Sequence, residues 1–205
     1  MRSGTLDPDR RKKRIRRRIQ AIVIYTAIAV GLAWFFESQA TTTMIFVRHA
    51  EKALIPVDDP GLSAEGEARA AELARQLVDA DVVAGIDAIY STNFRRTIET
   101  AQPVADALGL DIRIYENQQD DEPLVDAMVA DNKGKIILVV GHSNTLPTMI
   151  AALGASKKVP PIAEFEYDNL YLVSIPWFGK TKTIRMRFGT PYTGEPAESG
   201  MTMTQ

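Results

Sequence analysis

The sequence predicts an α/β protein, a three-layer α/β/α sandwich around a mostly parallel central sheet, preceded by an N-terminal transmembrane helix. Short apolar runs rich in isoleucine, valine and leucine alternate with longer helical stretches through most of the 205 residues. This alternation is typical of a parallel sheet with helices on both faces. Each of the two histidines follows one of the apolar runs, and a long uncharged segment near the N-terminus stands apart from the alternation.

The N-terminal segment has the charge pattern of a single-pass anchor. Eight basic residues lie in Arg10–Arg18, and the 18 residues from Ile19 to Phe36 carry no charge. As a helix these 18 residues span about 27 Å, close to the thickness of a bilayer core. We therefore expect a basic cytoplasmic segment (1–18), a transmembrane helix (19–36) in the cytoplasmic membrane, and the rest of the chain outside. A signal peptide cleaved at Ala40, giving a secreted or periplasmic protein, and a buried core helix remain the alternatives.

The body of the chain is acidic, with 15 basic against 24 acidic residues from Glu37 onward, a net charge of −9. This charge argues against nucleic-acid binding, and local cations must therefore attract any anionic ligand. The absence of cysteine excludes disulfides and thiolate metal sites. We expect neither a metal nor another cofactor, and the oligomeric state stays open.

The elements of the body follow from local signals. A strand at 43–47 precedes a helix at 63–79, which Ser63 caps. A strand at 86–90 precedes a helix at 93–108, which ends at Gly109 and which Pro103 should bend or divide. A short strand at 112–115, a helix at 120–131 and a strand at 135–140 come next. Pro147 suits the first turn of a helix at 145–153. Two late strands, 169–175 and 183–188, should pair through a turn at 177–180, and residues 190–205 have the composition of a flexible tail.

Chemically capable residues follow three of the apolar runs. Arg48-His49 follows the first run, Arg95-Arg96 lies in what should be the first turn of a helix after the second, and Gly141-His142-Ser143-Asn144 follows the third. Ligands of an open parallel sheet bind outside the carboxyl ends of its strands. Two imidazoles and an arginine at that edge indicate a site that binds an anion and performs nucleophilic or acid–base chemistry.

Four motifs in this order resemble those of the histidine phosphatase superfamily, phosphoglycerate mutase-like branch 1. Arg48-His49-Ala50 resembles its Arg-His-Gly/Ala motif, and Arg96-Thr97-Ile98-Glu99-Thr100-Ala101 its second arginine motif. Gly141-His142-Ser143 resembles the second-histidine motif, and the stretch from Pro60 to Gly66 the family's Pro-x-Leu-[Ser/Thr]-x-x-Gly element. Four ordered motifs are far more specific than Arg-His alone. The resemblance covers Thr43 to Gly189, which predicts a catalytic domain at 41–189.

The resemblance implies a metal-independent phosphomonoester hydrolase that forms a phosphohistidine. His49 would be the nucleophile, kept unprotonated by the nearby guanidinium groups. Arg48, Arg96 and His142 would bind the phosphoryl oxygens, and Ser143 and Asn144 would either bind substrate or cap the next helix. Many members place a general acid between the second arginine and the second histidine, where the candidates here are Glu116, Asp120, Asp121 and Glu122.

The substrate is expected to be an exported or envelope phosphorylated compound, either a small molecule or an envelope component. The short segment between Arg96 and His142 lacks the larger insertions of phosphoglycerate mutases, so mutase activity is less favoured. A phosphohistidine-protein phosphatase is a further alternative, because its good leaving group needs no acid. A different class, an anchored module that binds a phosphorylated ligand without turnover, would not need the free nucleophile of Arg48-His49.

Overall fold

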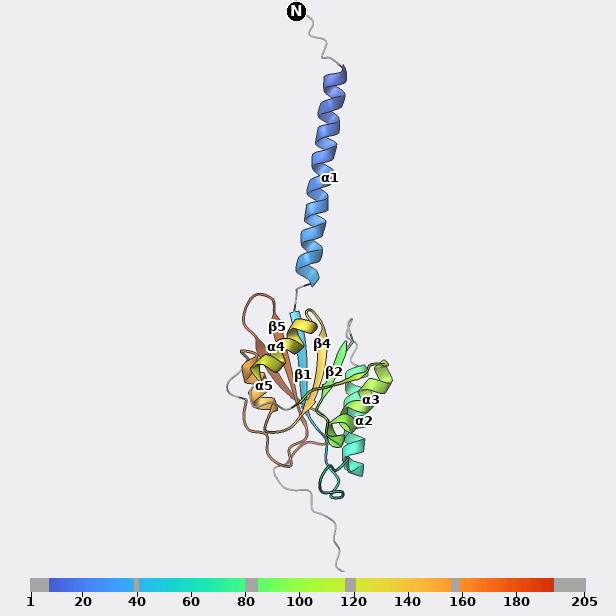
Figure 1. The fold of residues 1–205 in the computed structure, drawn as a ribbon, viewed down its shortest axis with the longest axis vertical. Coiled ribbons are helices and arrows are strands. Elements are labelled where there is room, and N and C mark those ends of the chain that lie inside the picture. Colours follow the sequence, from blue (N-terminus) through green and yellow to red (C-terminus); the bar gives the residue numbers. More distant parts are fainter. Residues whose placement is uncertain (1–7, 39–40, 80–84, 117–120, 156–158, 194–205) are drawn as a thin grey trace, which may run out of the picture. The chain divides into compact units, whose positions relative to one another are not determined.

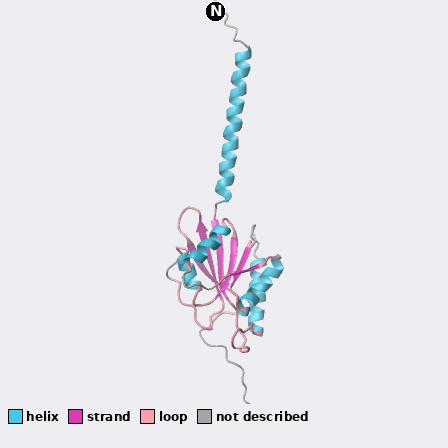
Figure 2. Cartoon of the chain, viewed as in Figure 1, coloured by secondary structure: helices cyan, strands magenta, loops and turns pink. Residues whose placement is uncertain are grey.

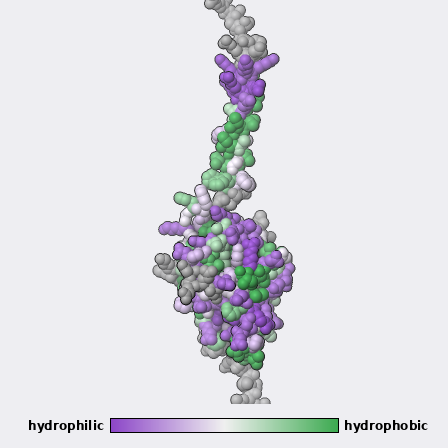
Figure 3. Space-filling model, viewed as in Figure 1, coloured by the Kyte–Doolittle hydropathy of each residue, from purple (hydrophilic) through white to green (hydrophobic). Residues whose placement is uncertain are grey.

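A computed structural model describes residues 8–38, 41–79, 85–116, 121–155 and 159–193. Its contacts divide the chain into two units, Met1–Ala40 and Thr41–Gln205. The first unit contains one helix, α1 (Pro8–Ser38), so the basic block and the uncharged segment share one continuous helix. Figure 3 shows the hydrophilic band of this helix followed by a hydrophobic one. Arg11–Phe36 is long and apolar enough to cross a membrane, with a mean hydropathy of 2.0 over an 18-residue window, although an N-terminal signal sequence also meets these criteria.

The second unit is built on one six-stranded sheet (Figure 1), as the sequence predicts. The strands are β1 (Thr41–Arg48), β2 (Ala88–Ser91), β3 (Ile112–Ile114), β4 (Ile136–Gly141), β5 (Asn169–Pro176) and β6 (Lys182–Arg187). Their order across the sheet is β3-β2-β4-β1-β5-β6. The first four strands in this order are parallel, whereas β5 and β6 run antiparallel to their neighbours. The mostly parallel sheet is therefore confirmed.

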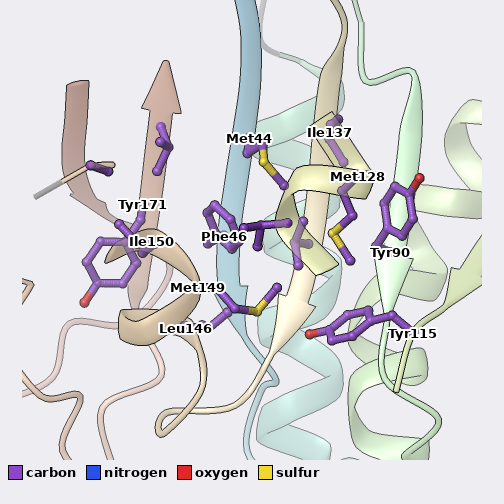
Figure 4. Packing of buried hydrophobic residues seen from close by; sticks show 14 of the residues in the cluster. Met44, Phe46, Tyr90, Tyr115, Met128, Ile137, Leu146, Met149, Ile150 and Tyr171 are labelled. Carbon is purple, nitrogen blue, oxygen red and sulfur yellow. The ribbon is translucent and has the colours of Figure 1, made fainter. Parts of the chain in front are cut away.

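Helices cover both faces of this sheet, which gives the three layers expected (Figure 2). Successive side chains of a strand point to opposite faces. Met44 and Phe46 of β1 thus pack with buried residues of α4 (Glu122–Asp131) and α5 (Leu146–Ala152), as Figure 4 shows. Ile45 and Val47 pack instead with residues of α2 (Ala64–Val78) and α3 (Arg95–Leu108). Because both faces are buried, the central strands are apolar throughout.

The helix ends agree with the sequence signals to within two residues where they are described. The Ser63 hydroxyl accepts a hydrogen bond from the backbone N–H of Gly66 at 3.2 Å and caps α2. Gly109 ends α3 in the left-handed conformation, with φ of 65°. Pro103 lies inside α3 without dividing it, because one unbroken helix runs from Arg95 to Leu108. Part of the expected helix at 120–131 lies outside the described residues, and α4 begins at Glu122.

The late strands pair as expected, and the end of the described chain is held against the domain. β5 and β6 form an antiparallel pair on either side of Trp177–Lys180. The predicted tail, 190–205, is described only as far as residue 193. Within that part, Thr190 accepts a hydrogen bond from Arg69 at 3.1 Å, and the N–H of Tyr192 donates to Asp168 at 2.8 Å.

Candidate active site

The register of the parallel strands brings the two histidines to the same edge of the sheet. Arg48, the last residue of β1, lies opposite Gly141, the last residue of β4, so His49 and His142 follow adjacent strand ends. Their ring centroids are 5.4 Å apart. Ser91 of β2 lies opposite Val140 and brings Thr92 to the same place. The site thus lies at the carboxyl ends of three neighbouring parallel strands, where open α/β sheets bind their ligands.

A cavity of about 390 Å³ opens at this edge. It is lined by basic, aromatic and polar side chains with a single carboxylate among them: Arg48, His49, Lys52, Phe94, Arg96, His142, Ser143, Asn144, Glu164, Phe165 and Tyr167. Two arginines and a lysine against one glutamate make this cavity electropositive, in contrast to the acidic body of the chain. Such a cavity suits an anionic ligand.

His49 is held as a neutral imidazole with a defined proton position. Its Nδ1 lies 2.7 Å from the carbonyl oxygen of Ala50. A carbonyl only accepts, so Nδ1 carries the proton and the other ring nitrogen, Nε2, has a free lone pair. Burial is the main cause that lowers the pKa of His49 to about 3, and the charges of Arg48 and Arg96 act in the same direction. The guanidinium effect expected from the sequence is therefore present, but desolvation is larger.

The second imidazole has the opposite proton arrangement. Thr97 Oγ1 donates to the carbonyl of Phe94 at 2.8 Å, so it accepts from Thr92 Oγ1 at 2.7 Å. Thr92 Oγ1 must then accept from Nε2 of His142, 3.1 Å away. The proton of a neutral His142 therefore lies on Nε2, and its Nδ1 has the free lone pair. Burial first, and then the charges of the two cavity arginines, lower the pKa of His142 to about 4.

Arg48 is buried and fixed by the loop that precedes β5. Its Nη1 donates to the carbonyl oxygens of Ala163 at 2.7 Å and Glu166 at 3.2 Å. Its guanidinium lies over the ring of Tyr167, with Cζ 4.2 Å from the ring centroid. Its buried Nε has no hydrogen-bond partner among the described residues. An unpaired buried donor costs about 1–3 kcal/mol, so an anion bound beside this guanidinium would remove a penalty.

The two adjacent arginines of α3 have different environments. Arg96 lines the cavity, with its Cζ 4.3 Å from the centroid of the Phe94 ring and Nη1 3.9 Å from a carboxylate oxygen of Asp59. Arg95 is more than half exposed, pairs with Glu99 at 3.0 Å and does not line the cavity. The structure therefore places Arg96 rather than Arg95 beside the histidines, which is the arrangement expected from the second arginine motif.

Other motif residues hold the loops around the cavity. Thr100 Oγ1 accepts from the backbone N–H of Ala50 at 2.9 Å, which fixes the chain just after His49. Glu99 accepts from the N–H of Leu62 at 2.6 Å. A Cβ at Gly61 would lie 2.6 Å from a carboxylate oxygen of Glu99, so the Glu99 side chain would have to shift to make room for it. These residues act through position and do not contact the cavity.

Ser143 and Asn144 lie in the cavity lining, as proposed from the sequence. The residue at the N-cap position of α5 is Thr145, and it makes no side-chain capping hydrogen bond. Neither Ser143 nor Asn144 occupies the N-cap position of α5. Their hydroxyl and amide groups remain predicted substrate contacts.

The four candidates for the general acid do not join this cluster where they are described. Glu116 is exposed, and Asp121 accepts a hydrogen bond from the hydroxyl of Thr148. Glu122 lies in the first turn of α4. None of these three lines the cavity, and Asp120 lies outside the described residues. The carboxyl group that does line the cavity belongs to Glu164, which lies beyond the second histidine.

Five residues that line the cavity lie outside the motifs recognised in the sequence: Lys52, Phe94, Glu164, Phe165 and Tyr167. Lys52 could form an ion pair with the preceding glutamate, but Glu51 instead binds Arg69 at 2.7 Å and leaves Lys52 at the cavity. Tyr167 stands next to a turn in the sequence, and only the folded loop brings it over Arg48. Among the described residues, no group of three His, Asp or Glu side chains is placed to hold a metal ion.

Comparison with known proteins shows which family and which folds the chain resembles. Residues 44–120 match the model of the histidine phosphatase superfamily (branch 1), whereas no curated protein matches the chain. The protein histidine phosphatase SixA, solved with tungstate, is 19% identical with a TM-score of 0.60, covering 71% of this chain and 96% of that one. A mycobacterial glucosyl-3-phosphoglycerate phosphatase is 15% identical with a TM-score of 0.53, covering 72% of this chain and 98% of that one.

A phosphoserine phosphatase from Entamoeba histolytica, solved with 3-phosphoglyceric acid, is 17% identical with a TM-score of 0.53. It covers 73% of this chain, and 97% of its own length is matched. At these identities the likeness shows a shared fold, and the matched lengths show that the second unit corresponds to nearly the whole of each neighbour. Together with the family match over residues 44–120, these findings show that the second unit shares the fold of these phosphatases and resembles the histidine phosphatase superfamily, branch 1.

Proposed function

We propose that the protein is a phosphatase that hydrolyses phosphomonoesters through a phosphohistidine formed on Nε2 of His49. The observation that carries the proposal is the Nδ1 hydrogen bond to Ala50, which leaves Nε2 as the nucleophilic nitrogen of a neutral ring. At a pKa of about 3 this ring is unprotonated at neutral pH. A phosphomonoester carries about two negative charges, which Arg48 and Arg96 would bind through their forked donors.

In the first step Nε2 of His49 attacks phosphorus, and the bond from phosphorus to the leaving oxygen breaks. In the second step water attacks the phosphohistidine, inorganic phosphate leaves, and His49 returns to its neutral form. Such transfer depends mainly on positioning and on stabilisation of the charge on the phosphoryl oxygens. His142 gains a second donor, at Nδ1, only when it is protonated, and the charge of a bound phosphate favours that state.

Trapping of the intermediate tests this proposal. Rapid quench in alkaline denaturant after mixing with a phosphorus-labelled aryl phosphate should leave acid-labile, alkali-stable label on His49, and His49→Ala should abolish both label and turnover. Recovery of the label on Ser143 or on a carboxylate would contradict the mechanism. The non-catalytic binding module predicts no turnover at all, so a steady-state assay of the unmodified protein separates the two hypotheses.

We propose Glu164 as the group that protonates the leaving oxygen, in preference to Glu116, Asp121 and Glu122. Support comes from its place in the cavity lining. A general acid matters most when the leaving group is poor. Glu164→Gln should therefore reduce turnover of alkyl phosphates much more than turnover of p-nitrophenyl phosphate, whereas the matched variant Asp121→Asn should reduce neither. If Asp120→Asn shows the leaving-group dependence and Glu164→Gln does not, the acid lies in the segment favoured from the sequence.

We further propose that the protein is a single-pass protein of the cytoplasmic membrane, with residues 1–18 inside, 19–36 spanning and the catalytic domain 41–189 outside. The support is the basic half of α1 followed by its uncharged half. The substrate would then be an exported small phosphate compound or a phosphorylated envelope component. The full-length protein should stay in the membrane pellet after alkaline carbonate washing, and protease added to spheroplasts should digest the domain. A soluble mature protein beginning at Thr41 would instead identify a cleaved signal.

A further inference from the structure

The edge of the sheet opposite the cavity carries an exposed aromatic and basic hairpin tip. Trp177 is 59% exposed and Phe178 is 89% exposed, at the turn between β5 and β6. Lys180 and Lys182 follow directly and are exposed as well. We call these four residues the hairpin tip. No acidic residue occurs between Asn169 and Phe188, so the whole hairpin is uncharged or basic, although the domain as a whole is acidic.

The pairing of the strands fixes the hairpin tip beside the first residue of the domain. Thr41 lies opposite Pro176 in the antiparallel pair of β1 and β5, so Trp177, which follows the last residue of β5, lies beside the start of β1. Thr41 comes five residues after Phe36, the last residue of the apolar segment. Five residues of fully extended chain reach about 18 Å at most. If α1 spans the bilayer, covalent geometry therefore keeps this edge of the domain near the bilayer surface.

A second loop at the same edge adds basic charge. The N–H of Thr43 donates to the carbonyl of Lys135 at 2.9 Å, and the N–H of Gly134 donates to Thr42 at 3.0 Å. These bonds hold Lys133 and Lys135, both exposed, beside the start of β1. Three exposed carboxylates, Asp87, Asp111 and Asp131, also lie at the starts of strands or in this loop. The hairpin itself, from Asn169 to Phe188, contributes only basic charge to this edge.

We propose that the hairpin tip docks on the bilayer that holds α1, with Trp177 and Phe178 in the headgroup region and the lysines on anionic lipid phosphates. Aromatic side chains favour the membrane–water interface, and lysines near an anionic surface add attraction. The proposal rests on the membrane anchoring proposed above and adds a defined orientation of the domain. The cavity, at the other ends of the parallel strands, then faces away from the membrane. Phosphorylated compounds in solution can reach it, whereas lipid phosphates of the same leaflet cannot.

Tryptophan fluorescence of the full-length protein in vesicles tests the docking directly. The chain has two tryptophans, so Trp34→Phe leaves Trp177 as the only reporter. In vesicles of mixed neutral and anionic lipid, bromine atoms near the headgroup end of the acyl chains should quench most of its emission. The double change Lys180→Glu and Lys182→Glu should weaken this quenching in anionic vesicles and leave it unchanged in neutral ones.

A reporter on the other side of the domain provides the matched control. Leu54 is 88% exposed and lies in the loop that follows β1, on the cavity side of the sheet. Leu54→Trp, in a chain with Trp34→Phe and Trp177→Phe, should not be quenched by brominated lipid. Quenching at position 54 but not at 177 would show the reverse orientation and overturn the proposal.

Flotation of the same vesicles separates the two hypotheses. One outcome is that the protein floats with the vesicles while Trp177 stays fully accessible to a water-soluble quencher. That result would support membrane anchoring and refute docking of the hairpin tip. If the protein does not float with the vesicles, membrane anchoring is refuted, and the docking proposal, which rests on it, is refuted as well.

Discussion

Replacement of Thr92 with valine tests whether the hydroxyl chain behind His142 matters for catalysis. Valine keeps the shape of the side chain and removes the hydroxyl that accepts the Nε2 proton of His142 and donates to Thr97. Both groups are buried, since Thr92 is 1% exposed and His142 is 7% exposed. A buried donor left without its acceptor costs about 1–3 kcal/mol, which corresponds to a factor of roughly 5 to 150 in a rate or equilibrium constant.

The loss should appear in kcat more than in KM. Without its acceptor, the neutral His142 ring can flip or change tautomer, and its alignment is needed most in the transition state. We expect Thr92→Val to lower kcat on an aryl phosphate by about tenfold to a hundredfold. Thr92→Ser restores the hydroxyl and should recover most of the rate. Circular dichroism and thermal melting of both variants control for unfolding.

A Thr92→Val enzyme that folds and keeps kcat within about twofold of the parent would refute this account. An equal loss in Thr92→Ser would also refute it, because the methyl group and not the hydrogen bond would then be responsible. A rise in KM at constant kcat would show that Thr92 contributes equally to binding in the ground state and in the transition state.

The buried histidines, one glycine contact and the paired arginines each give a further prediction. Burial lowers the pKa values of His49 and His142 to about 3 and about 4. Both imidazoles should therefore remain neutral at pH 5.5 in an NMR titration. A titration midpoint near 6.5 for either histidine would contradict the desolvation argument. The unfolded chain binds more protons than the folded one between pH 6.5 and about 3, so stability should fall as the pH is lowered through this window, measured by denaturant unfolding. Gly66→Ala should lower the free energy of unfolding by about 1–3 kcal/mol, because the added Cβ would lie 2.2 Å from the backbone carbonyl oxygen of Glu51. Gly85→Ala is the control, because the space around Gly85 is open, and its melting temperature should match that of the parent. Arg96→Lys should lower kcat/KM at least tenfold by removing the forked donor, while Arg95→Lys should stay close to the parent; equal effects would show that both arginines bind phosphate.

The fold and the centre of the site could be predicted from the sequence because their signals are local. Apolar runs marked the strands of the sheet, and the parallel order placed the residues after β1 and after β4 at one edge. The residues that long-range loops bring to the cavity have no such signal. Tyr167 reaches Arg48, and Glu164 reaches the cavity, only because the segment before β5 folds over the end of β1, which lies more than a hundred residues earlier in the sequence.

The proton positions could not be read from the sequence either. They depend on which carbonyl or hydroxyl each ring nitrogen meets, such as Ala50 for His49 and Thr92 for His142. The prediction of the general acid shows a related limit. No sequence motif marks this residue, so the sequence offered four carboxylates without a way to choose among them. Three of them are described, and contacts place them outside the cavity.

If the domain is anchored beside a membrane as proposed, the length of β1 has an electrostatic consequence for catalysis. Its eight residues, Thr41–Arg48, extend over roughly 26 Å at about 3.3 Å per residue, so the cavity lies this far from the edge where the domain begins. The negative surface potential of an anionic leaflet decays over a Debye length of about 8–10 Å at physiological ionic strength. A dianionic substrate would be depleted close to such a leaflet but is at its bulk concentration three Debye lengths away. Turnover should therefore be the same in neutral and in anionic vesicles, and any dependence of kcat/KM on salt should come from Arg48, Arg96 and Lys52.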